Sequence, residues 1–209
     1  SIVGSDNCIT NPDVLSSYLG DWRGKHLGST PLVLLPKSSR AISEIIKICF
    51  ENNIAVIPQG GNTSLCGANI PNSTKNRIEI VINSSKLNQI LEFDIHNQTL
   101  IAQSGCVLSN IQNKAEEHGL LFPLSLGAEG TCQIGGNLST NAGGVNVLKY
   151  GMSREFLKDY GEFLGTKKWK WVDDLTLTMS NGQKCFFTHG RSADISKVSQ
   201  AMGMSAGQG

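Results

Sequence analysis

The sequence predicts an α+β fold that contains at least one pair of parallel strands. The first observation is a strand, helix and strand between residues 32 and 57, at the spacing of a βαβ unit. The second is an alternating strand pattern at residues 77–82, and the third is a set of glycine-rich segments that follow predicted strands. We find no internal repeat of domain size, so these elements are expected to form one α+β architecture.

Bulk composition limits the classes of function. The 209 residues, 39% of them hydrophobic and 17% charged, are enough for one sizeable core or for two small lobes that share one. The formal net charge of +1 provides no global field to attract nucleic acid or an anionic membrane. No apolar run approaches the roughly 20 residues needed to cross a bilayer. No secretory signal is visible. Residue 1 is not Met, however, so a leader that has been removed or left out is compatible with the sequence.

The βαβ unit begins with a short buried strand at residues 32–35, which Pro36 closes. Ser38 or Ser39 then caps a helix, and residues 54–57 form the second strand, parallel to the first. The apolar positions of the helix fall on one stripe: Ile42, Ile45, Ile46, Cys49 and Phe50. The segment PQGGNTS (58–64) therefore lies at the carboxyl end of a strand, where open α/β sheets usually bind ligands.

The remaining elements are shorter. Residues 77–82 are predicted to form a half-buried strand, and two further strands at 90–93 and 99–103 are joined by a turn. A short helix from about 108 to 117 ends at Gly119, and the glycine-rich IGGNLSTNAGG follows as a loop. Residues 175–187 are predicted to form a hairpin with Asn181 and Gly182 as the turn, and the tail from 191 frames one short helix.

Six cysteines are scattered without C-x-x-C spacing or a partnering histidine at zinc spacing. This pattern favours reduced structural thiols, and hence a reducing compartment, over a disulfide framework. The four histidines form no spaced cluster and are expected at the surface. Neither a catalytic residue nor a metal ligand is expected in this chain.

Three glycine pairs (60–61, 135–136 and 143–144) carry the candidate function. Glycine allows positive φ and lets backbone N–H groups approach a ligand closely, as in an anion-binding nest. Uncharged donors and acceptors are added by the flanking Asn62, Thr63, Ser64, Asn137, Thr140 and Asn141. Tight turns are the alternative explanation, but three such pairs favour a pyrophosphate cradle. Rossmann, P-loop and nucleophile motifs are absent.

At these residues the chain resembles the FAD-binding PCMH-type domain of the vanillyl-alcohol-oxidase flavoprotein superfamily. Within it, the chain is most similar to the branch of D-2-hydroxyglutarate and D-lactate dehydrogenases. The likeness covers residues 21–39, 51–71 and 93–151, including PQGGNTS and PLSLGAEGTCQIGGNLSTNAGG. It implies two α+β subdomains and a domain at residues 27–190, with an N-terminal extension at 1–26 and a tail at 191–209.

The resemblance implies that two segments bind FAD. In the first, the family's loop wraps the pyrophosphate, which assigns Pro58, Gln59, Gly60, Gly61, Asn62, Thr63 and Ser64. In the second, residues that line the flavin are Pro123, Leu124, Gly127, Ala128, Gly130 and Thr131. The cradle is completed by Gly135, Gly136, Asn137, Thr140, Asn141, Gly143 and Gly144. Some relatives attach flavin through a histidine of the first loop; this loop has none, so FAD is expected to be non-covalent.

The chain also departs from the family. Ser64 replaces a usual glycine, which would strain the loop if that position needs positive φ, and Ser125 replaces a common aspartate. Residues 152–171 look like an insertion. Relatives are expected to continue for about as many residues again, with the substrate-binding cap domain in that part.

The resemblance therefore implies the FAD-binding portion of a D-2-hydroxyacid dehydrogenase, which oxidises D-2-hydroxyglutarate or D-lactate to the 2-oxo acid. Its expected partners are the D-2-hydroxy acid, an electron acceptor (a flavoprotein, cytochrome or quinone), and a separate cap domain or a second copy. No nucleic-acid partner is expected. The compartment is the cytoplasm in a bacterium or the mitochondrial matrix in a eukaryote. A non-catalytic flavin-binding remnant, a subunit of a split flavoprotein, and a cradle for another nucleotide such as CoA are the alternatives.

Overall fold

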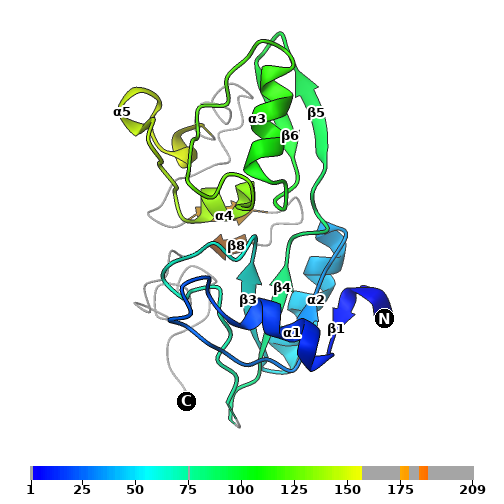
Figure 1. The fold of residues 1–209 in the computed structure, drawn as a ribbon. Helices are drawn as coiled ribbons and strands as arrows, with labels where there is room; N and C mark the ends of the chain where they lie inside the picture. Colours follow the sequence, from blue (N-terminus) through cyan, green and yellow to red (C-terminus); the bar gives the residue numbers. More distant parts are fainter. Residues whose placement is uncertain (1, 75, 157–174, 179–183, 188–209) are drawn as a thin grey trace, which may run out of the picture.

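The computed structural model describes residues 2–74 and 76–156, together with the backbone of two strands at 175–178 and 184–187. The described residues form two lobes, one above the other in Figure 1. The first lobe contains the chain up to β4, and the second contains β5, β6, α3, α4 and α5. This arrangement agrees with the expected α+β class and its two subdomains. No helix in these parts of the chain is long and apolar enough to cross a membrane.

The first lobe is built on a four-stranded sheet in the order β1-β2-β4-β3. Its strands are β1 (Cys8–Ile9), β2 (Val33–Leu34), β3 (Ala55–Gln59) and β4 (Glu79–Asn83). β2 and β3 are both parallel to β4, while β1 is antiparallel to β2. The predicted βαβ strands are thus parallel, as expected, but β4 lies between them.

The strand predicted at 77–82 is confirmed as β4, but the expectation that it is half-buried is wrong. All five residues of β4 are buried, because helices cover both faces of the sheet. On one face, Val81 packs with Leu15 of helix α1 (Pro12–Leu19). On the other face, Ile80 and Ile82 pack with Ile45 of helix α2 (Ser39–Glu51). The alternation in the sequence therefore separates two apolar faces rather than an apolar and a polar one.

Helix α2 (Ser39–Glu51) is capped by Ser38, whose hydroxyl accepts a 3.1 Å hydrogen bond from the Ala41 N–H. Its predicted apolar stripe is too wide. Ile45 and Cys49 are buried, but Ile46 is 39% exposed and Phe50 is 65% exposed. Only the narrower face centred on Ile45 and Cys49 meets the sheet.

The first residues of the chain contribute to the first lobe. The 3₁₀ helix η1 (Ser5–Asn7) leads into β1, and helix α1 (Pro12–Leu19) is capped by Asn11, which accepts a hydrogen bond from the Asp13 N–H. Neither β1 nor α1 was expected from the sequence. Leu15 of α1 is part of the core, so residues expected as an extension complete the sheet and cover one of its faces. The domain boundaries themselves stay a prediction.

The second lobe combines a hairpin with three helices. Strands β5 (Ile90–Asp94) and β6 (Thr99–Ala102) pair antiparallel, and α3 (Leu108–Glu116) packs beside them. The chain leaves α3 through Gly119, whose φ of 70° agrees with the predicted end of this helix. The segment IGGNLS, expected as a loop, instead forms α4 (Ile134–Ser139), and α5 (Val147–Tyr150) follows.

The predicted hairpin near the carboxyl end is confirmed in its strands. β7 (Leu175–Thr178) and β8 (Lys184–Phe187) pair antiparallel, with Leu175 opposite Phe187. The predicted turn residues, the tail from 191 and most of the 152–171 segment lie outside the described residues. The expected reduced cysteines are confirmed for five positions, since Cys8, Cys49, Cys66, Cys106 and Cys132 are free thiols.

Candidate functional site

The two glycine-rich segments meet where the lobes face each other (Figure 1). We call residues 58–64 the first glycine loop and residues 123–144 the second glycine segment. A Cβ added to Gly61 would lie 2.0 Å from the carbonyl oxygen of Thr131, and one added to Gly60 would lie 3.3 Å from Oε1 of Gln133. The backbone of the first loop therefore rests directly on the second segment.

This contact changes the reason for glycine at position 61. From the sequence, Gly61 is expected to contact the FAD pyrophosphate. The structure shows that even a single methyl group there would collide with backbone rather than with a flexible side chain. Gly61 is consequently required for the two segments to join.

Buried polar side chains fix this junction. The Ser84 hydroxyl donates a 2.7 Å hydrogen bond to Oε1 of Gln133, which ties the end of β4 to the second lobe. The Asn83 amide donates to Gly60 O at 3.0 Å and to Oε1 of Gln59 at 3.1 Å. Sequence reasoning missed Asn83, Ser84 and Gln133. The available signal was the row of polar residues directly after an apolar strand.

The side-chain amides of the first glycine loop hold the loop in its conformation. Asn62 Nδ2 donates to Gly20 O at 2.8 Å, and its Oδ1 accepts a short hydrogen bond from Asn69. Gln59 is 3% exposed and donates to the carbonyl oxygens of Tyr18 and Asn69. Both ends of the Asn62 amide are engaged within the protein, so this side chain holds the loop, and its assignment to the cofactor stays a prediction.

The concern about strain at Ser64 is resolved by Asn62. Within the first loop, Asn62 has the positive φ of 56°, and Ser64 is not among the residues with positive φ. Asparagine tolerates this region better than most residues. The Ser64 hydroxyl accepts a 3.3 Å hydrogen bond from the Cys66 N–H. Pro58 is exposed at the end of β3, and Thr63 is half-buried.

The second glycine segment folds back on itself. Asn146 donates to Pro123 O at 3.0 Å, and the Val145 N–H donates to Ser125 O at 3.1 Å. Gly144 has a φ of 73°, and its Cβ would lie 1.9 Å from Ser125 O. Leu124 is fully buried in a cluster with Leu108 and Cys132, so its side chain supports the segment from below and only its backbone can face a ligand.

Three glycines of this segment have no structural requirement for glycine. Gly127, Gly130 and Gly136 have no atom within 4 Å of an added Cβ, and none of them has positive φ. Gly135 and Gly143 differ, because their Cβ positions would meet Ser104 and Val147. Open space beside an unstrained glycine is expected where a ligand approaches the backbone closely. The residues present therefore fit the cofactor cradle that the sequence suggested.

Side chains of the same segment are largely engaged within the protein. Asn141 donates to Met152 Sδ at 3.6 Å and accepts from the Arg154 N–H at 3.1 Å. Thr140 donates to Gly136 O, and Thr131 donates to Ala128 O. Asn137 is 6% exposed. The Asn141 amide is thus engaged on both sides, whereas the buried Oδ1 of Asn137 has no hydrogen-bond partner among the described residues and is left, with the backbone groups, for a ligand.

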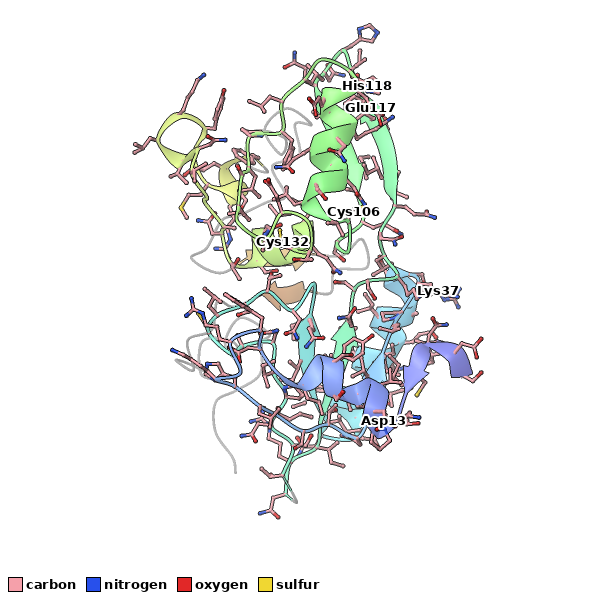
Figure 2. All side chains as sticks on the ribbon, viewed as in Figure 1. Asp13, Lys37, Cys106, Glu117, His118 and Cys132 are labelled. Carbon is pink, nitrogen blue, oxygen red and sulfur yellow. The ribbon has the colours of Figure 1, made fainter. Side chains whose placement is uncertain are left out.

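Two buried thiols, Cys106 and Cys132, lie near the junction of the lobes (Figure 2). Burial raises the pKa of both, although an N–H of the Asn137 side chain partly offsets the effect at Cys132. Both thiols stay protonated near neutral pH, which makes them poor nucleophiles. Among the described residues there is also no group of three or more His, Cys, Asp or Glu side chains that could hold a metal.

Comparison with known proteins gives a consistent picture. The family described as the FAD binding domain matches residues 30–166. The mitochondrial D-2-hydroxyglutarate dehydrogenase of Danio rerio is 45% identical over 146 residues, which cover 70% of this chain and 27% of the relative. The corresponding protein of Arabidopsis thaliana is 40% identical over 150 residues, covering 72% and 26%.

A solved structure supports the fold. An alkyldihydroxyacetonephosphate synthase superposes with a TM-score of 0.66 at 20% identity, covering 73% of this chain and 29% of the other. The chain spans about a quarter of the length of the curated relatives it matches. The relatives are therefore longer than expected from the sequence, which implied about as many residues again. The family match covers both glycine-rich segments and more than half of the chain. The chain belongs to the FAD-binding domain family.

Proposed function

We propose that this chain is the FAD-binding portion of a flavin-dependent D-2-hydroxyacid dehydrogenase. The observation that carries the proposal is the set of open glycines, Gly127, Gly130 and Gly136, beside the junction of the two glycine-rich segments. Glycine at these positions is explained by neither packing nor backbone conformation, and a bound cofactor supplies the missing reason. Bound FAD would supply the electron acceptor for oxidation of a hydroxy acid.

The chain's own residues would bind and orient the cofactor. Backbone N–H groups of Gly60, Gly61, Asn62 and Thr63 are assigned to the pyrophosphate, since a nest of N–H groups needs no lysine, which fits the near-neutral composition. Backbone of the second segment from Gly127 to Gly136 is assigned to the remainder. The amides of Gln59 and Asn62 hold the first loop in place from behind. With no histidine in this loop, attachment of FAD is non-covalent.

The reaction and its partners follow from the relatives. The relatives from zebrafish and Arabidopsis are named as D-2-hydroxyglutarate dehydrogenases of mitochondria, which supports a D-2-hydroxy acid substrate and a mitochondrial location. D-lactate is the other substrate of this class. Oxidation requires a base and groups that bind the carboxylate. The described residues offer no such cluster beside the glycines, so we assign these groups to a separate substrate-binding part and place the cofactor domain at residues 27–190.

The test is a visible absorbance spectrum of the purified chain, recorded before and after titration with FAD and again after acid release. We expect an oxidised-flavin spectrum, with all the flavin in the supernatant after acid treatment. A protein that stays colourless with added FAD would refute cofactor binding. Flavin that stays with the precipitated protein would refute the non-covalent attachment.

A second measurement addresses the reaction. D-2-hydroxyglutarate and D-lactate are added under anaerobic conditions to the flavin-loaded chain, and loss of the flavin absorbance is followed. Bleaching by a D-2-hydroxy acid, but not by its L-enantiomer, supports the dehydrogenase. A loaded chain that no D-2-hydroxy acid bleaches, even with the corresponding remainder of a full-length relative present, favours the non-catalytic flavin-binding subunit.

A further inference from the structure

The arm formed by residues 137–144 contains the last of the predicted cofactor residues, and it is held by two residues that follow it in the sequence. These are Ser153 and Arg154, which lie at the start of the predicted insertion at 152–171 and within the residues that the family match covers. The chain passes through α5, turns at Gly151 with a φ of 81°, and returns to the arm. Neither residue was among the predicted cofactor ligands.

Ser153 is fully buried against the arm. Its hydroxyl lies 2.8 Å from Ala142 O and 3.0 Å from Asn137 O, and its backbone N–H donates to Ala142 O at 3.0 Å. Ala142 and Asn137 lie on either side of the bend at Asn141, whose φ is 51°. Ser153 thus adds a side-chain link to a bend that a 2.8 Å hydrogen bond from the Ala142 N–H to Asn137 O also closes.

Arg154 closes the end of α4. Its Nη2 donates to Ser139 O at 2.6 Å, its Nε donates to Leu138 O at 3.0 Å, and its backbone N–H donates to Oδ1 of Asn141 at 3.1 Å. The carbonyl groups at the end of a helix have no partner within the helix and attract cations. The planar guanidinium can reach two neighbouring carbonyls at once, which the single ammonium of lysine does less well.

The charge of Arg154 is directed at the arm rather than at an acidic side chain. The ion pairs among the described residues involve Arg40, Lys47, Arg77 and Lys114, each with a glutamate. The hydrogen bonds of the Arg154 guanidinium go to main-chain carbonyls of the helix that precedes the bend. Its role is consequently tied to the position of the arm.

We propose that Arg154, together with Ser153, is a positioning residue that holds the arm in the shape that receives the cofactor. The inference rests on the proposed FAD site. If the arm is correctly placed in only a fraction of the molecules, the apparent dissociation constant rises by the inverse of that fraction. Loss of the guanidinium should therefore weaken FAD binding although Arg154 itself need not touch FAD.

The experiment compares Arg154→Ala and Arg154→Lys with the parent chain, and uses Arg40→Ala as the matched control for the loss of an exposed arginine. Hydrogen exchange of the amides from 140 to 145 is measured without FAD, and the FAD dissociation constant is measured by quenching of flavin fluorescence. For Arg154→Ala we expect faster exchange in the arm and about tenfold weaker FAD binding. Arg154→Lys should be intermediate, and millimolar guanidinium should restore part of the affinity of Arg154→Ala.

The outcomes separate this inference from the proposed function. A parent chain that fails to bind FAD refutes the proposed function, and the exchange data alone then decide whether Arg154 holds the arm. Unchanged exchange in both Arg154 variants overturns the inference, as does faster exchange with unchanged FAD affinity. If Arg154→Ala does not fold, Arg154→Lys provides the same two measurements. The control Arg40→Ala must bind FAD as tightly as the parent chain. A comparable loss of FAD affinity in this control would indicate a general effect of charge.

Discussion

Gly61 and Gly136 show two different reasons for glycine within one site. At Gly61, an added Cβ would lie 2.0 Å from the Thr131 carbonyl oxygen, so glycine allows two backbone segments to touch. At Gly136, an added Cβ meets no atom within 4 Å, and the residue lies in the first turn of α4. The first glycine therefore serves the fold, and we propose that the second leaves room for the ligand.

These two reasons predict opposite effects of the same substitution. Gly61→Ala should lower the free energy of unfolding by about 1–3 kcal/mol or more, because backbone must move to admit the methyl group. Gly136→Ala should leave stability unchanged or raise it by up to about 1 kcal/mol, since alanine favours helix. It should also weaken FAD binding by about tenfold, equivalent to about 1.4 kcal/mol.

Urea unfolding without FAD and flavin fluorescence titration measure the two quantities separately. Gly135→Ala is a useful comparison, because its Cβ would meet Ser104 and should reduce stability as Gly61→Ala does. A Gly136→Ala variant that binds FAD as tightly as the parent would remove the main support for the cradle.

At the scale of elements, the ends of helices are set by short polar contacts. The sequence allowed either Ser38 or Ser39 as the cap of α2. In the structure, Ser38 accepts the hydrogen bond from the Ala41 N–H, and Ser39 is the first helical residue. The position of this cap decides where α2 begins, and therefore which residues reach the sheet.

The two serines give a matched pair of variants. Ser38→Ala should destabilise the protein by about 1 kcal/mol through loss of the cap. Ser39→Ala should change stability by no more than a few tenths of a kcal/mol, because alanine is a good helix former. The midpoint of thermal or urea unfolding distinguishes them, and equal losses in both variants would contradict the assigned cap.

At the scale of the whole molecule, the two lobes are joined by contacts that are also part of the site. Ser84 at the end of β4 donates to Gln133 just before α4, and the first glycine loop rests on Thr131. Gln133 is buried and Ser84 is half-buried at this junction. Cofactor binding and attachment of the lobes consequently depend on the same residues.

Removal of this link should affect both properties. Ser84→Ala leaves a buried Gln133 oxygen without its donor and should cost about 1–3 kcal/mol of stability. Ser85→Ala is the control, because Ser85 contributes its backbone N–H to Asn83 Oδ1 and that bond is retained. FAD affinity should fall in Ser84→Ala and persist in Ser85→Ala. Unchanged stability in Ser84→Ala would show that the lobes are held by other contacts.

Local patterns were sufficient for much of the fold. Periodicity located α2, α3 and the β5-β6 hairpin, because each is encoded by contiguous residues. The same patterns missed β1 and α1, and misjudged β4. β4 alternates as a half-buried strand does, yet α1 and α2 cover its two faces, and this coverage depends on segments far apart in the chain.

The motifs PQGGNTS and IGGNLSTNAGG were enough to identify the family and the two glycine-rich segments, because they are contiguous and chemically specific. The contacts of the residues within these segments became visible only in the folded chain. It showed Gly61 at the contact between the lobes, the Asn62 and Asn141 amides already engaged, and Arg154 at the end of α4. The physical reason is that packing and hydrogen-bond partners are non-local: whether a glycine faces backbone or open space depends on residues tens of positions away.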